Sequence, residues 1–209
     1  MINSRIRMAG SVNAPIYKAD IAGGALMLPE SRRIARLLID GIDGDEWRRK
    51  IERENILQKR SPSTAKRQAN LIRSRLDLVD PGVWNIIADS PASIASQAVF
   101  AAAIQHSALF ADFLPIVRDR FRVLQGDLPR RAWIDYVDRC HDIDPRMPHW
   151  KVSTVDKLGD AAFRMLHEVG FLTGGRLNIL RPVEIDAAVI RALKAGRHHL
   201  ALDRIQVSL

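Results

Sequence analysis

Between residues 61 and 79 the hydrophobic positions recur at intervals of three and four residues. They are Ala65, Ala69, Ile72, Leu76 and Val79. This spacing places them on one face of an α-helix and predicts that this face packs against a core. Ser61 followed by Pro62 predicts where the helix begins, because a hydroxyl residue caps the first turn and proline suits the first helical position. The opposite face is polar and basic, with Ser63, Lys66, Arg67, Asn70, Arg73 and Ser74.

The same periodicity predicts further helices at residues 29–41, 46–57, 91–110, 112–124, 130–140, 153–170 and 183–195. Only residues 58–60 separate the second of these from the basic helix, and so short a connection is typical of a helix-turn-helix unit. Two apolar runs, FLT and RLNIL, flank Gly174 and Gly175 and predict a β-hairpin with a two-residue turn. A helix followed directly by a hairpin is the layout of a winged helix.

These elements predict a mainly α protein with an N-terminal helix-turn-helix lobe and a C-terminal winged-helix-like lobe carrying one short β-hairpin. A length of 209 residues is sufficient for two small lobes with separate cores. The expected divisions are a flexible N-terminal arm at residues 1–22, the helix-turn-helix lobe at 23–80, a central helical scaffold at 81–145, the winged-helix-like lobe at 146–196 and a tail at 197–209.

Composition narrows the range of partners. The chain has 32 Lys and Arg residues against 24 Asp and Glu residues, and its formal net charge of +8 favours a polyanion such as nucleic acid. An aromatic content of 6% is low for the stacking platforms that bind single strands, so double-stranded DNA is the expected partner. Cys140 is the only cysteine, which excludes an intrachain disulfide. With neither a secretion signal nor an unbroken apolar run of membrane-spanning length, we expect a cytoplasmic protein that binds no membrane.

The candidate DNA-binding residues lie on the basic helix, just before it and in the hairpin. They are Lys59, Arg60, Ser61, Ser63, Thr64, Lys66, Arg67, Asn70, Arg73 and Arg176. The backbone amides at the helix N-terminus and the three hydroxyl groups favour a phosphate, and the cations at positions 59, 60, 66 and 67 would neutralise its neighbours. Asn70 and Arg73 lie where contacts to base edges are chemically feasible. Arg176, expected at the hairpin tip, could enter a minor groove or contact a phosphate.

No pattern of residues indicates catalysis. Cys140, His141 and Asp142 are consecutive in a predicted helix, and their side chains therefore point about 100° apart, which prevents a nucleophile and base arrangement. His198 and His199 lack a third metal ligand at a useful spacing. The glycines form neither a phosphate-binding loop nor a dinucleotide fingerprint. We therefore expect no catalytic residue, no metal site and no cofactor.

Three runs of sequence, at residues 30–76, 110–121 and 153–172, resemble the BrxA family of small proteins from bacteriophage exclusion (BREX) systems. The residues that carry the resemblance are Trp47, Glu54, Asn55, Leu57, Gln58, Ser63, Arg67, Arg75, Leu76, Ser153, Thr154, Lys157 and Gly170. The similarity covers roughly residues 23–180. It implies a DNA-binding accessory of an antiphage locus that also encodes a methyltransferase, large ATPases and an alkaline-phosphatase-like protein, which are candidate partners.

The residues alone leave alternatives open. The basic face could be a solvated surface that contacts proteins, and the chain would then be a protein-interaction adaptor within the defence complex, docking through its Ala-rich centre. A transcriptional regulator of the operon would bind a palindrome as a dimer, and an antitermination-like protein would bind hairpin RNA. The function that we prefer is a non-catalytic double-stranded DNA-binding accessory, and binding of duplex without turnover distinguishes it.

Overall fold

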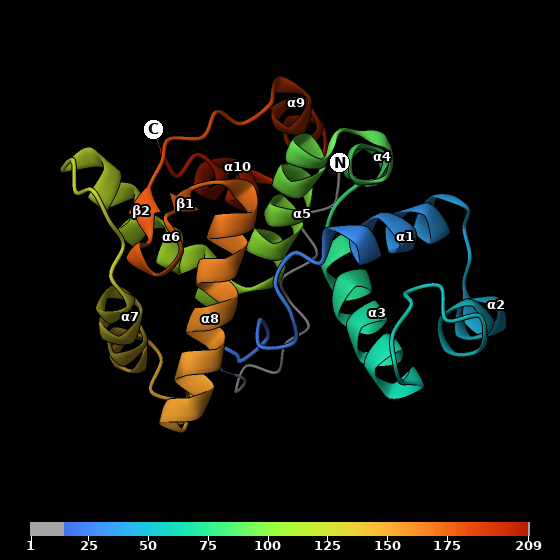
Figure 1. Ribbon diagram of the computed structural model, residues 1–209, viewed down its shortest axis with the longest axis horizontal. Coiled ribbons are helices and arrows are strands. Elements are labelled where there is room, and N and C mark those ends of the chain that lie inside the picture. Colours follow the sequence, from blue (N-terminus) through green and yellow to red (C-terminus); the bar gives the residue numbers. More distant parts are fainter. Residues whose placement is uncertain (1–14, 209) are drawn as a thin grey trace, which may run out of the picture.

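Helices form along most of the chain, because apolar residues recur at helical spacing and prolines or glycines interrupt the pattern. The computed structural model describes residues 15–208. Its helices are α1 (Leu28–Ile39), α2 (Gly44–Arg48), α3 (Pro62–Leu76), α4 (Pro81–Asp89), α5 (Ala92–His106), α6 (Ala108–Arg122), α7 (Arg130–Ile143), α8 (Val152–Val169), α9 (Ala187–Ala195) and α10 (His199–Ile205). The strands β1 (Leu172–Thr173) and β2 (Ile179–Leu180) pair antiparallel. The prediction of a mainly α protein with one short hairpin is confirmed (Figure 1).

Helix α5 is the centre of the core. Every residue from Ala95 to Ile104 is buried, because α1, α3, α4, α6, α8, α9 and α10 all pack against this helix. In Figure 1 the elements α1 to α4 lie on one side of α5, and α6 to α8 lie on the other. No single helix of residues 15–208 has the length and apolar character to cross a membrane; α5 and α6 meet that test only as a pair, bent by 116°.

An aromatic cluster joins α6, α7 and α8. The ring of Phe113 lies 4.9 Å from that of Trp133 and 5.4 Å from that of Tyr136, measured between centroids. Gly159 allows α8 to approach this cluster closely, since a Cβ at its position would lie 2.7 Å from Cδ1 of Trp133. The helices can therefore pack at this distance only with glycine at residue 159.

The N-terminal segment departs from its prediction. Residues 1–14 of the expected flexible arm lie outside the described residues, but residues 15–22 pack against the core. Tyr17 and Ile21 are buried, and the Ile16 N–H donates to Oδ2 of Asp144 at 2.5 Å. The prediction of a flexible arm is wrong for residues 15–22, because two apolar side chains in this short segment are enough to anchor it.

The C-terminal segment is also more ordered than predicted. Within the expected tail, residues His199–Ile205 form α10, which packs against α5, α6 and α9. Ala201, Ile205 and Val207 have no exposed surface. The prediction of a tail is wrong for this segment, because its few apolar residues complete the cover over α5.

The hairpin has a longer connection than predicted. Thr173 pairs with Ile179 and Leu172 with Leu180, so residues 174–178 form the loop, including the 3₁₀ turn η2 (Gly175–Leu177). A two-residue turn is therefore wrong. The physical reason lies in Asn178, which adopts a left-handed conformation at φ 47° and returns the chain to the strand three positions later than the glycine pair suggested.

One hydrophobic cluster includes residues from all the predicted lobes, from Tyr17 to Val207. Helix α4, expected to belong to the scaffold, packs extensively on α1 of the expected helix-turn-helix lobe. Helix α8, expected to belong to the winged-helix-like lobe, packs on α5 in the same core. The division of the chain into lobes stays a prediction.

Candidate nucleic-acid interface

The segment before α3 is built differently from the predicted helix-turn-helix turn. Helix α2 continues into a single π-helical turn, η1 (Arg49–Arg53), in which the Glu54 N–H donates to the Arg49 carbonyl at 3.0 Å. Asn55 and Gln58 then adopt positive φ values of 47° and 54°. The predicted helix to residue 57 and the turn at 58–60 are therefore wrong, since residues 54–61 connect η1 to α3. Asparagine tolerates the left-handed conformation that ends the helix early.

Side chains on both sides hold this connection in place. Asn55 donates from Nδ2 to the Lys59 carbonyl at 2.8 Å and accepts from the Lys59 N–H at 2.9 Å. Arg33 of α1 donates to the Ile56 carbonyl at 2.5 Å and to Oε1 of Gln58 at 3.1 Å. Leu57 is 1% exposed. These contacts therefore fix the position of the first turn of α3.

The first turn of α3 is capped as the sequence predicts. The Thr64 N–H donates to Oγ of Ser61 at 3.3 Å, and the Ser61 hydroxyl lies 2.9 Å from that of Thr64. The predicted apolar face is confirmed, since Ala65, Ala69, Ile72 and Leu76 are all buried. The hydroxyls of Ser61 and Thr64 thus serve the cap, and Ser63 is the exposed hydroxyl of this turn.

The outward side of α3 and the residue before its cap carry a set of exposed donors that we call the α3 basic surface: Arg60, Ser63, Lys66, Arg67 and Asn70. Arg60 and Asn70 have no side-chain partner among residues 15–208. Nζ of Lys66, whose side chain is 61% exposed, lies 3.2 Å from Oε1 of Glu52, and Arg67 donates to the Gly23 carbonyl at 3.2 Å. Contacts this exposed are weak, so a phosphate can replace them.

Two other candidate residues are held by protein partners. Lys59 pairs with Glu30 of α1, and both side chains are largely covered. Arg73 lies 4.5 Å above the Trp47 ring and 3.2 Å from Oδ1 of Asp43. The Gly44 N–H, and secondarily Arg73, lower the pKa of Asp43. These contacts give Lys59 and Arg73 a structural role in fixing α1 and α2 beside α3.

Arg75 belongs to the same basic run but faces inward. It is 1% exposed and donates to the carbonyls of Ala25 at 2.6 Å and Gly24 at 3.0 Å. Burial lowers the pKa of its guanidinium to about 10, against the opposing effects of Asp20 and Glu168. Arg75 therefore remains charged at neutral pH and ties α3 to the segment before α1.

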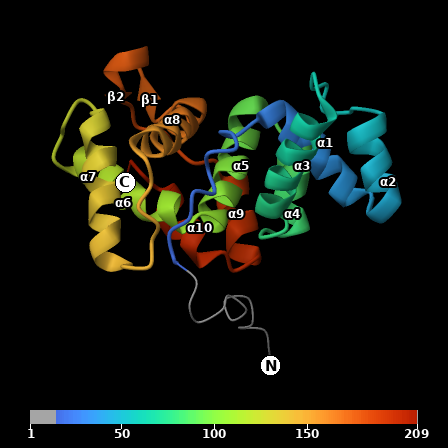
Figure 2. The same cartoon turned by 90° about the horizontal axis from the view of Figure 1, so that it is seen from below.

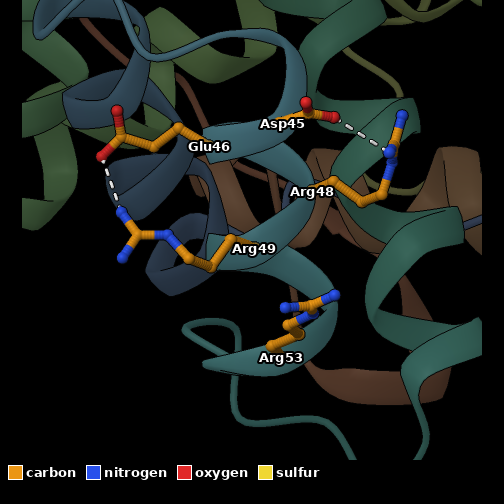
Figure 3. Close-up of a pocket in the computed structure, with 5 residues that line it drawn as sticks. All are labelled: Asp45, Glu46, Arg48, Arg49 and Arg53. Carbon is orange, nitrogen blue, oxygen red and sulfur yellow. Dashed lines mark hydrogen bonds and ion pairs between the residues drawn. The ribbon is translucent and has the colours of Figure 1, made fainter.

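A neighbouring cationic pocket was missed in the sequence. An open pocket of about 490 Å³ is lined by Arg48, Arg49 and Arg53, on α2 and the π-helical turn, together with two acidic residues. Figure 3 shows these five side chains. Arg48 pairs with Asp45 at 3.0 Å and Arg49 with Glu46 at 3.1 Å, whereas Arg53 has no partner in the described part of the chain. The basic run at residues 48–53 was the only indication of this pocket in the sequence. Which of its cations is free of an ion pair depends on the folded structure.

Arg176 is separated from these residues along the fold. It belongs to η2 in the hairpin loop, which lies beside α8, whereas α3 lies across the N-terminal segment from α8 (Figure 1). Figure 2 nevertheless shows the hairpin loop and the connection before α3 on the same side of the molecule, the upper side in that view. The structure therefore does not join the candidate residues into one patch, but the loop that carries Arg176 and the connection before α3 lie on the same side of the molecule.

The fold and this surface define a class: a mainly helical protein with an exposed cationic surface on its third helix. Comparison with known proteins gives the family. The family model for BrxA matches residues 15–197. The chain therefore belongs to the BrxA family, a family of BREX-system proteins with a role in antiphage defence, and the resemblance in the sequence is confirmed.

Individual relatives agree with this assignment. A protein of Paramagnetospirillum magneticum described as "BREX protein BrxA" is 48% identical over 196 residues, which cover 93% of this chain and 98% of the relative. A protein of Escherichia coli O9:H4 with the same description is 35% identical over 172 residues, covering 82% and 81%. The crystal structure of an uncharacterized protein from Magnetospirillum magneticum has a TM-score of 0.88 and 47% identity, covering 93% of this chain and all of that one.

Proposed function

We propose that this protein is a non-catalytic accessory of a BREX antiphage system that binds double-stranded DNA through the α3 basic surface. The observation that carries the proposal is the two-sided character of α3. One face is buried against the core, while Lys66 and Arg67 are exposed on the other and Arg60 is exposed just before the helix. The net charge of +8 supports a polyanionic partner.

The chemistry of the surface suits a DNA backbone. Pro62 has no N–H and the Thr64 N–H is used by the Ser61 cap, so the Ser63 N–H and the positive end of the α3 dipole are the groups that attract a phosphate beside Ser63. Arg60 is free to neutralise the adjoining phosphate, and Lys66 and Arg67 exchange weak contacts for stronger charge-assisted ones. Asn70 follows two turns into the helix, where its amide can reach a base edge.

The proposal extends to place and partners. The protein acts in the cytoplasm, where the phage DNA and the other BREX components meet, and it delivers duplex to those components rather than altering it. The methyltransferase, the ATPases and the phosphatase-like protein are its candidate partners. No cofactor or metal is needed, because binding to phosphates requires only fixed cations and amides.

Mobility shift with duplex DNA tests this proposal. Random duplexes and duplexes from upstream of the operon are compared at two salt concentrations, with single strands and hairpin RNA as competitors. We expect binding to duplex that weakens steeply with salt, because counterions are released from the backbone. The proposal fails if the purified protein does not bind duplex even at low ionic strength.

A second candidate, a protein-interaction adaptor, has a specific observation in its favour. Leu124 is 91% exposed and Leu177 is 69% exposed, so two large apolar side chains are available for contact with another protein. Salt-insensitive capture of a BREX component, together with no DNA shift, would select this function.

A further inference from the structure

A second cationic pocket lies away from the α3 basic surface. It is an open pocket of about 720 Å³ between α7, α8 and the hairpin loop. Its lining consists of Arg130, Asp160, Phe163, Arg164, His167, Gly175, Arg176 and Asn178. Three guanidinium groups from three separate elements thus line one pocket with a single carboxylate, which leaves an excess of positive charge there.

One of the three arginines is fixed in position. The Arg130 guanidinium lies 4.7 Å above the centroid of the Phe163 ring and donates to Oδ1 of Asp160 at 2.6 Å. Arg164 and Arg176 are exposed and have no partner within residues 15–208. Arg130 therefore sets the base of the pocket, while the other two arginines can take an anion without first breaking an ion pair.

The loop that carries Arg176 is itself anchored. Asn178 is 7% exposed, and its Oδ1 lies 3.0 Å from Nε2 of His167 on α8. Its carbonyl accepts from the Leu128 N–H at 2.9 Å, which ties the loop to the segment before α7. A loop held at its end loses little conformational freedom when a ligand binds.

The shape and chemistry of the pocket define the ligand class. Guanidinium groups match the oxygens of a phosphate through paired hydrogen bonds. The Phe163 ring is 4% exposed and covered by Arg130, so it offers no face for a base to stack on. The pocket therefore suits a backbone phosphate rather than a base.

We propose that this pocket holds a backbone phosphate of the same duplex that the α3 basic surface binds, with Arg164 and Arg176 as its contacts and Arg130 as their neighbour at the base. The inference rests on the proposed function. It is supported by Figure 2, in which the hairpin loop and the connection before α3 rise on the same side of the molecule. One duplex lying over that side meets both sets of cations.

The test compares two double variants with the unmodified protein: Arg164→Gln with Arg176→Gln, and Lys66→Gln with Arg67→Gln. Affinity for a duplex of about 30 base pairs is measured by fluorescence anisotropy across a series of salt concentrations. For the pocket variant we expect a loss of affinity of about tenfold at low salt and a decrease in the salt slope by about one, the value for one lost phosphate contact. Unchanged melting temperatures identify folded variants.

The outcomes separate the two proposals. If the unmodified protein does not bind duplex, the proposed function fails. If it binds, and the α3 variant is weakened while the pocket variant keeps its affinity and salt slope, the pocket is not a DNA contact and this inference is overturned. Calorimetry with inorganic phosphate and with a mononucleotide completes the design. The inference would also be overturned if either ligand binds tightly to the unmodified protein, and if the pocket variant loses that binding but keeps its affinity for duplex.

Discussion

Reversing two charges on the α3 basic surface gives the sharpest prediction. Lys66→Glu combined with Arg67→Glu should strongly weaken duplex binding and leave the fold nearly unchanged. Lys66 forms one exposed ion pair with Glu52, and Arg67 forms one exposed hydrogen bond to the Gly23 carbonyl. Exposed contacts of this kind contribute about 0–1 kcal/mol each, which for a chain of this size changes the melting temperature by only about 2–4 °C per kcal/mol.

The expected change in binding follows from counterion release. Each phosphate contact contributes about 0.9 to the slope of log affinity against log salt, so two lost contacts lower the slope by about 1.8. When the salt concentration rises fourfold, from 50 to 200 mM, both proteins lose affinity for duplex. The factor by which affinity falls should be about 12 times smaller for the variant than for the unmodified protein. Repulsion between the introduced carboxylates and the phosphates lowers the affinity further at low salt.

Fluorescence anisotropy across the salt series measures this change, with a matched control on α9. Arg191→Glu combined with Lys194→Glu changes the net charge equally, but α9 lies on the lower side of the molecule in Figure 2, opposite the hairpin loop. The control should keep most of the affinity. Equal losses in both double variants would show that only the net charge matters, and an unaltered slope in the α3 variant would refute the assignment of the surface.

Three further predictions concern the structure that supports this surface. Arg75→Met removes the donors to two carbonyls, Gly24 and Ala25, and should lower the free energy of unfolding by about 2–4 kcal/mol in urea denaturation; a smaller loss than 1 kcal/mol would mean that water replaces the donors. Gly159→Ala places a methyl group against Trp133 and should cost about 1–3 kcal/mol, whereas Gly82→Ala, with no atom within 4 Å, should not destabilise the protein. Burial, and secondarily Arg75, lower the pKa of His106 to about 4. The unfolded chain binds this proton more readily, so the stability of the native protein should fall as the pH decreases from about 6.5 towards 4, and His106→Gln should reduce that dependence; an identical pH profile in the variant would contradict the assignment.

Much of the helical framework could be predicted from the sequence because helix formation depends on local spacing. The apolar positions of α3 needed no knowledge of their partners, and neither did Ser61 as its cap. The hairpin was also found from two apolar runs around a glycine pair. Its loop was not, because Asn178 adopts its left-handed conformation while held by His167 and Leu128, residues distant in sequence.

The candidate site illustrates the same limit. A list of cations near α3 could be read from the sequence, but nothing in their local sequence separates Lys59 and Arg73 from Arg60 and Lys66. Glu30 pairs with Lys59, Trp47 and Asp43 hold Arg73, and the carbonyls before α1 enclose Arg75. No spacing rule predicts these partners, since they come from other elements.

The sequence by itself determined that the protein is helical, basic and a member of the BrxA family, because periodicity, charge and family motifs depend only on the order of the amino acids. The tertiary structure decided which cations are exposed, that residues 15–22 and 199–205 join the core, and that the hairpin loop and the start of α3 lie on one side. The burial of a side chain and its ion pairs depend on which segments contact one another in the folded protein. Those contacts are a property of the whole folded chain and cannot be derived from any single segment.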